Sequence, residues 1–283
     1  MTSSYSASLL ISKAARASQY AAKYPTRRIA LRVSYDGTDY HGWQRQPDQE
    51  GTIQGILERS LRDFLREDVV VDAASRTDAG VHAEDQLIAL TLNHPIRLDG
   101  LVRGLNRRLP QAIAVREPHR VPLDFQPRFA NQGKRYRYQI YNGPTRHPLL
   151  DRYATWTHYT LDLESIMMGL EFLRGEQDFA SFAARDGQHK STTREIFYTS
   201  ASRQNLTRGG ALITLRFGGT GFMKQMVRNL VGTLVEVGRG HWPVSRIPEI
   251  LAARDRCAAG PTAAARGLCL EEMFWCPPQM SST

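Results

Sequence analysis

The sequence predicts an α+β fold of two ferredoxin-like halves, each β-α-β-β-α-β, whose antiparallel sheets join into one extended central sheet. Two observations predict it. Apolar residues recur with the period of strands and of amphipathic helices in the order strand, helix, strand, strand, helix, strand. The same order then occurs a second time, after a segment with three prolines in the middle of the chain.

In the first half, the helix near residues 52–66 has the clearest pattern, because its apolar side chains fall on one face. A second helix near 98–109 shows the same spacing over fewer residues. The strands expected in this half are 29–35, 69–74, 86–93 and 112–116.

In the second half, the segment 222–237 is apolar around much of its circumference and therefore predicts a buried helix. Arg228 lies within it and needs a partner, because an unpaired buried charge is very costly. Asp78 is a candidate partner, unless Arg228 emerges at the surface. The other expected elements are strands at 135–142, 194–202, 212–217 and 268–275, and helices at 162–173 and near 247–253.

These elements predict an N-terminal domain over 28–117, a connector over 118–133, a C-terminal domain over 134–276 and a short tail over 277–283. Residues 1–27 form an extension that we expect to be disordered. The first 35 residues contain no acid, a composition that also resembles an organellar transit peptide. A start codon assigned too early would give the same pattern.

Composition narrows the classes of function. The chain has 37 basic and 28 acidic residues, a net charge of +9 that favours a polyanionic partner. No apolar run approaches the roughly 20 residues that span a bilayer, so we expect no membrane partner. Three cysteines without Cys-x-x-Cys spacing predict neither a disulfide framework nor a zinc site, and a reducing compartment is the simple interpretation.

The run Ser-Arg-Thr-Asp-Ala-Gly-Val-His-Ala at 75–83 is the strongest candidate for a catalytic segment. It follows an expected strand, and Gly80 permits a sharp turn or a close approach to a ligand. Asp78 would project from the end of that strand, with Arg76 nearby to favour its ionised form. In isolation, Asp-x-Gly in a loop also fits an ordinary turn.

The segment 134–141 begins with Lys134, after which basic and aromatic residues alternate over 135–138. A period of two places Tyr136 and Tyr138 on one face and Arg135 and Arg137 on the other. Open, RRM-like sheets often present such tyrosines to single-stranded nucleic acid, while arginines hold phosphates. The same pattern also fits a half-buried strand with an aromatic inner face.

Metal chemistry finds little support in the sequence. His82-Ala83-Glu84 matches the H-x-E half of a zinc deaminase signature, but its Pro-Cys-x-x-Cys half is absent. No H-E-x-x-H, Walker or dinucleotide-binding motif occurs either. The sequence therefore predicts no metal, and one carboxylate with arginines and a tyrosine is the catalytic inventory.

Taken together, these motifs resemble the bacterial-type tRNA pseudouridine synthases of the TruA class. The similarity extends from about residue 28 to residue 275, and six motifs occur in the order of that family. The matching segments are 35–46, 76–82, 106 with 109–110, 135–138, 178–182 and 226–232. Directly before the second of these segments, this chain has Ser75 where glycine is common in the family.

The resemblance implies an isomerase that converts uridine to pseudouridine at positions 38–40 of the tRNA anticodon stem-loop. It implies that Asp78 is the catalytic aspartate, that Tyr136 contacts the target uridine and that Arg228 pairs with Asp78. Arg76 would fill the space of the extruded nucleotide or clamp its phosphate. The family uses no metal and no cofactor, and its members are homodimers that hold one tRNA across both subunits.

Two other functions remain open at this point: a pseudouridine synthase for a different RNA, and a non-catalytic tRNA-binding module on the same scaffold. The residues also do not decide whether Asp78 would add to the base, attack C1′ or abstract a sugar proton. We expect a cytoplasmic protein, or an organellar one if the N-terminal extension is a transit peptide.

Overall fold

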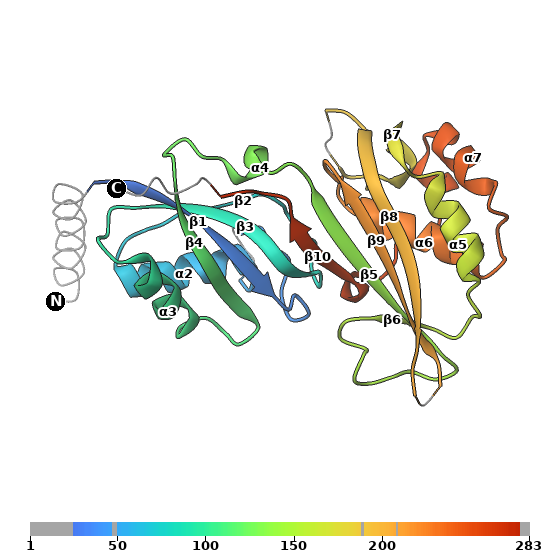
Figure 1. The fold of residues 1–283 in the computed structure, drawn as a ribbon, viewed down its shortest axis with the longest axis horizontal. Helices are drawn as coiled ribbons and strands as arrows, with labels where there is room; N and C mark the ends of the chain where they lie inside the picture. The colour runs from blue at the N-terminus through green and yellow to red at the C-terminus, as the bar shows by residue number, and fades with distance from the viewer. Residues whose placement is uncertain (1–24, 47–49, 188–189, 208, 278–283) are drawn as a thin grey trace, which may run out of the picture.

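The computed structural model describes residues 25–46, 50–187, 190–207 and 209–277. Within these residues it has one ten-stranded sheet and six α-helices, which confirms the predicted α+β class (Figure 1). The expected N-terminal extension, up to residue 24, and the tail beyond Pro277 lie outside the described residues.

Both halves arrange their four main strands in one spatial order, in which the fourth strand lies beside the first, the first beside the third and the third beside the second. Helices α2 and α3 lie beside the N-terminal strands, and α5 and α6 beside the C-terminal ones (Figure 1). The first half consists of β1 (Arg27–Tyr35), α2 (Ile53–Leu65), β2 (Val71–Ala73), β3 (His82–Leu92), α3 (Leu98–Asn106) and β4 (Ile113–Val121).

The second half repeats this plan with additional short elements. Its main elements are β5 (Lys134–Asn142), α5 (Leu163–Glu171), β8 (Thr193–Asn205), β9 (Ala211–Gly219), α6 (Met226–Gly238) and β10 (Leu268–Met273). The additional ones are α4 (Pro127–Ala130), β6 (Thr155–Thr157), β7 (Gly175–Asp178) and α7 (Arg246–Ala253).

The two sheets join because β2 is short. It pairs only with residues 88–90 of β3 and leaves the start of that strand free. The last strand, β10, pairs in parallel with His82 and Ala83 at this free edge and antiparallel with β5 on its other side. The loop from β2 to β3 therefore ends where the two halves meet (Figure 1).

Local chemistry sets the helix ends. Thr52 caps α2 by accepting a hydrogen bond from the Gly55 N–H, and Arg66 ends it in the left-handed region at φ 57°. Helix α6 begins at Met226, four residues later than expected, because Gln225 has φ 59° and breaks the helical path. The apolar face of α6 is still buried as predicted, with Leu230 and Leu234 fully covered.

Candidate active site

A pocket of about 980 Å³ lies beside the loop that joins β2 to β3. Residues of this loop, the start of β5 and the start of α6 line it. All four residues that the sequence singled out, Arg76, Asp78, Tyr136 and Arg228, are among its lining residues. The fold thus brings side chains from both halves of the chain together in one pocket.

Backbone hydrogen bonds to a buried side chain hold the start of this loop. Gln86, on β3, is fully buried; its amide nitrogen donates to the Ser75 carbonyl at 2.7 Å and its amide oxygen accepts from the Ser75 N–H at 3.2 Å. Such a bidentate bond satisfies both backbone groups of a residue that no longer pairs within the sheet. It fixes the position where the chain leaves β2.

The middle of the loop packs on the segment 40–43. The Trp43 N–H donates to the Thr77 carbonyl at 3.0 Å, and the Gly80 N–H donates to the Tyr40 carbonyl at 3.3 Å. Gly42 has φ +86°, and a Cβ there would lie 2.9 to 3.1 Å from backbone atoms of residues 77–79. Glycine is therefore required where this segment touches the backbone of Asp78.

Asp78 and Arg228 form an ion pair across the boundary between the two halves. Arg228 Nη1 donates to Asp78 Oδ2 at 3.1 Å, and Arg228 Nε donates to the Ala263 carbonyl at 2.7 Å. The side chains of Asp78 and Arg228 are 25% and 15% exposed, so the carboxylate still faces the pocket. The bond from Arg228 Nε to the Ala263 carbonyl orients the guanidinium, which in turn orients Asp78. The partner suggested for Arg228 by the sequence is the one that the structure gives it.

Tyr136 lines the pocket and is 6% exposed. Its hydroxyl lies 3.1 Å from Ser75 Oγ, and its ring meets that of Phe222 edge-on, with 5.3 Å between the ring centroids. Burial raises the pKa of Tyr136 to about 12; the Ser75 hydrogen bond opposes this and the charge of Asp78 adds to it. The phenol therefore stays protonated at neutral pH.

Six cations and two carboxylates line the pocket, an excess of positive charge. Arg228 pairs with Asp78, and Lys224 pairs with Asp186 at 2.5 Å. Within the described residues, the remaining cations form no ion pair with a carboxylate: Arg76, Arg128, Lys134 and Arg194.

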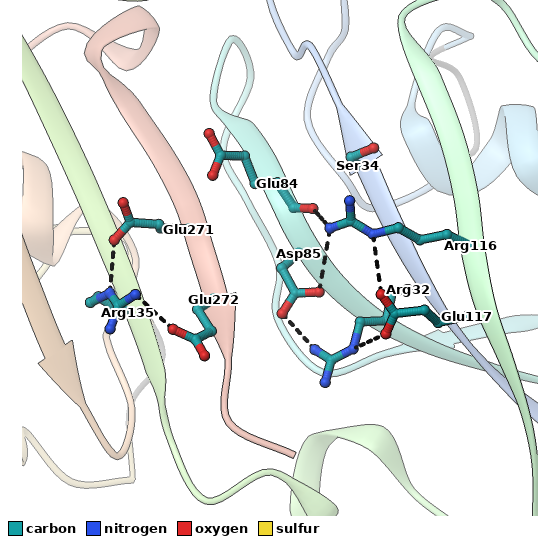
Figure 2. Close-up of a pocket in the computed structure, with 9 residues that line it drawn as sticks. All are labelled: Arg32, Ser34, Glu84, Asp85, Arg116, Glu117, Arg135, Glu271 and Glu272. Carbon is teal, nitrogen blue, oxygen red and sulfur yellow. Dashed lines mark hydrogen bonds and ion pairs between the residues drawn. The ribbon is translucent and has the colours of Figure 1, made fainter. Parts of the chain in front are cut away.

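The opposite face of the sheet carries a second hollow, of about 780 Å³, lined by charged residues and one serine (Figure 2). Its three cations are already paired: Arg32 with Asp85 at 2.5 Å, Arg116 with Asp85 at 3.8 Å, and Arg135 with Glu271 at 2.7 Å. Arg137, on the same face of β5, pairs with Glu84 at 2.6 Å. The arginines that the strand pattern suggested as phosphate ligands therefore lie away from the pocket and are neutralised by acids.

His82, the histidine of the partial zinc signature, contacts two separate segments of the fold. His82 Nδ1 lies 3.1 Å from both the Gly37 nitrogen and Asp36 Oδ1, and Nε2 lies 3.1 Å from the Arg266 carbonyl oxygen. It thereby links the loop after β1 to the segment before β10. Over the described ranges, no cluster of three or more metal-binding side chains occurs. In the same ranges, no helix is long and apolar enough to cross a membrane.

Sequence reasoning missed three residues of the site: Ser75 as a hydrogen-bond partner, Lys134, and Gln86. The alternation along β5 carried a signal for Lys134, since a period of two places it on the face of Tyr136. Gln86 gave no signal, because a single amide inside an apolar strand has many possible partners.

Known proteins resemble this chain over most of its length. The family model described as tRNA pseudouridine synthase matches residues 31–130 and 171–275. A protein of Myxococcus xanthus named tRNA pseudouridine synthase A is 42% identical over 249 residues, covering 88% of this chain and 92% of the relative. Proteins of the same name from Geotalea uraniireducens and Klebsiella pneumoniae are each 40% identical, over 88% and 87% of this chain and 100% and 89% of their own.

Proposed function

The chain belongs to the tRNA pseudouridine synthase family, and we propose that it isomerises uridine to pseudouridine at positions 38–40 of the tRNA anticodon stem-loop, with Asp78 as the catalytic carboxylate. The observation that carries this proposal is the Asp78–Arg228 pair, 3.1 Å apart, at a pocket of about 980 Å³. The pocket is of the size that binds small molecules, and so of a size to take one extruded nucleotide.

The reaction balances within the substrate. The bond from ribose C1′ to uracil N1 breaks, the base rotates, and C5 bonds to C1′ while the C5 hydrogen is lost and N1 gains a proton. No co-reactant is consumed, so an ionised carboxylate with a fixed orientation is a sufficient starting point for each of the three routes open to Asp78. Arg228 keeps a positive charge beside that carboxylate and holds its direction.

Extrusion of the nucleotide is the second requirement, because a base inside a duplex cannot rotate. Unstacking and unpairing cost on the order of a few kcal/mol, which contacts to the extruded nucleotide must offset. In this proposal the Tyr136 hydroxyl contacts the uracil, and Arg76, an exposed residue that lines the pocket, holds a phosphate or takes the vacated space.

The wider proposal includes a homodimer that holds the tRNA across both subunits, and a cytoplasmic location. The net charge of +9 supports a polyanionic partner, since two chains together carry twice that charge. Light scattering on the purified protein, with and without tRNA, measures the assembly. Fractionation of cells that express the full chain measures whether residues 1–27 direct it to an organelle instead.

Pseudouridine mapping tests the proposed substrate. An unmodified tRNA transcript is incubated with the protein, and carbodiimide adducts are located by primer extension. We expect new stops one nucleotide 3′ of positions 38–40, and none when those uridines are replaced by cytidines. Modification of a ribosomal RNA fragment in preference to tRNA would instead establish a synthase for another RNA, and tight tRNA binding without stops on any RNA would establish a binding module.

A further inference from the structure

The pocket contains a buried lysine that the proposed reaction does not use. Lys134 is 8% exposed, and its Nζ donates to Ser75 Oγ at 3.2 Å. No carboxylate of the described residues lies within ion-pair distance of it. A buried charge without a counterion is costly, and stability alone would favour an apolar residue here.

Ser75 connects this lysine to Tyr136, because its hydroxyl oxygen lies 3.2 Å from Lys134 Nζ and 3.1 Å from Tyr136 Oη. An ammonium group only donates, so Ser75 accepts from Lys134. The serine has one proton of its own, and the Tyr136 oxygen is the acceptor that the structure places beside it. When Ser75 donates to that oxygen, the phenolic proton of Tyr136 is free to point into the pocket.

We propose that Lys134 is a positioning residue for the isomerisation: through Ser75 it directs the phenolic proton of Tyr136 toward the substrate. This inference rests on the function proposed above for the pocket. A neutral lysine has a lone pair and accepts from Ser75, which then accepts from Tyr136. The direction of the chain reverses, and the proton of Tyr136 turns away from the substrate.

The surroundings of Lys134 predict the pH at which this reversal occurs. On the neighbouring strands Lys134 pairs with Gly219 and Met273, which carry no charge. Arg128, on α4, is the charged neighbour that acts on it. Burial first, and then the positive charge of Arg128, lower the pKa of Lys134 to about 8. Tyr136, a titratable group on the same face of its own strand, stays neutral to a far higher pH.

A double-mutant cycle tests the proposal in the full-length protein. Single-turnover rates are measured by release of tritium from tRNA labelled at uridine C5, for Lys134→Met, Tyr136→Phe and the double variant. We expect each single change to lower the rate about tenfold, the scale of one hydrogen bond, with tRNA affinity within about twofold of the wild type. The double variant should be no slower than the slower single variant.

Other outcomes contradict the proposal. Losses that multiply in the double variant would mean that Lys134 does not act through Tyr136. A wild-type rate in Lys134→Met overturns the role outright, and a loss confined to tRNA affinity would make Lys134 a phosphate contact. Lys134→Arg keeps the charge at all accessible pH and should remove the decline in rate that we expect for the wild type above about pH 8.

A measurement without RNA separates this inference from the proposed function. The ¹³Cζ signal of labelled tyrosine, assigned to Tyr136 with the Tyr136→Phe variant, is followed from pH 7 to 9.5. We expect a shift that follows the titration of Lys134 and is absent in Lys134→Met. A flat signal in the wild type overturns the proposal even if the enzyme is active. A shifting signal supports it even if this tRNA is not modified.

Discussion

Gly42→Ala should reduce catalysis by displacing the backbone of Asp78, although residue 42 itself carries no reactive group. An alanine Cβ at this position lies 2.9, 3.0 and 3.1 Å from Thr77 O, Ala79 N and Asp78 C, whereas ordinary contacts begin at 3.4 Å. The loop must therefore move by 0.3 to 0.5 Å, the differences between 3.4 and these distances. Since a misplacement of about 1 Å can cost about 100-fold in rate, we expect a loss on the order of tenfold.

Gly175→Ala is the matched control. Gly175 has φ +89°, close to the +86° of Gly42, but a Cβ there meets nothing within 4 Å. Both variants should lose about 1–2 kcal/mol of unfolding free energy from the left-handed backbone. Single-turnover rates and thermal melts on both variants separate the two effects. Equal rates in the two would refute the steric argument.

Three further predictions concern charged residues. Arg228→Met should lower kcat about tenfold to a hundredfold at unchanged tRNA affinity, because Asp78 loses a charge-assisted hydrogen bond worth about 1.5–3 kcal/mol; an unchanged kcat would show that the pair is incidental. Arg76→Gln should weaken tRNA binding and reduce the slope of log Kd against log salt by about 0.7–0.9, and an unchanged slope argues against a phosphate contact. Burial opposes ionisation of Glu271, but hydrogen bonds from its arginine partners outweigh it and hold its pKa below the usual range. Its contribution to stability is thus full above about pH 5 and lost as the pH falls through the folded-state pKa. Glu271→Gln should cost about 1.5–3 kcal/mol in urea melts at pH 7 and less at pH 3.5, and a deficit that does not change with pH would contradict this.

Most of the fold could be predicted because long elements carry a periodic pattern. The expected helix at 52–66 corresponds to α2 with both of its capping residues. Strands β6 and β7 were missed, because segments of three and four residues are too short to show alternation. Strand β4 extends to Val121, beyond the expected end at 116. Within this part of β4, Glu117 has φ 48°, in the left-handed region. The resulting kink interrupts the alternation of side chains along the strand.

The site could be predicted in its residues but not in its connections. A carboxylate two residues before a glycine is unusual, and so is an arginine within an apolar helix. Asp78 and Arg228 can therefore each be recognised from the sequence. Their contact depends on β10 joining the two halves, and pairing between distant strands leaves no periodic signal. The same holds for Ser75, whose partners Gln86 and Lys134 come from two different strands.

The most direct test of the central claim compares the wild type with Asp78→Asn on tRNA labelled with tritium at uridine C5, with tRNA affinity measured on the same samples. Because the C5 hydrogen is lost when C5 bonds to C1′, tritium release reports the isomerisation itself. We expect release by the wild type, and in Asp78→Asn a rate lower by more than about 100-fold at nearly unchanged affinity. A variant that still releases tritium at a rate near the wild type would contradict the role of Asp78.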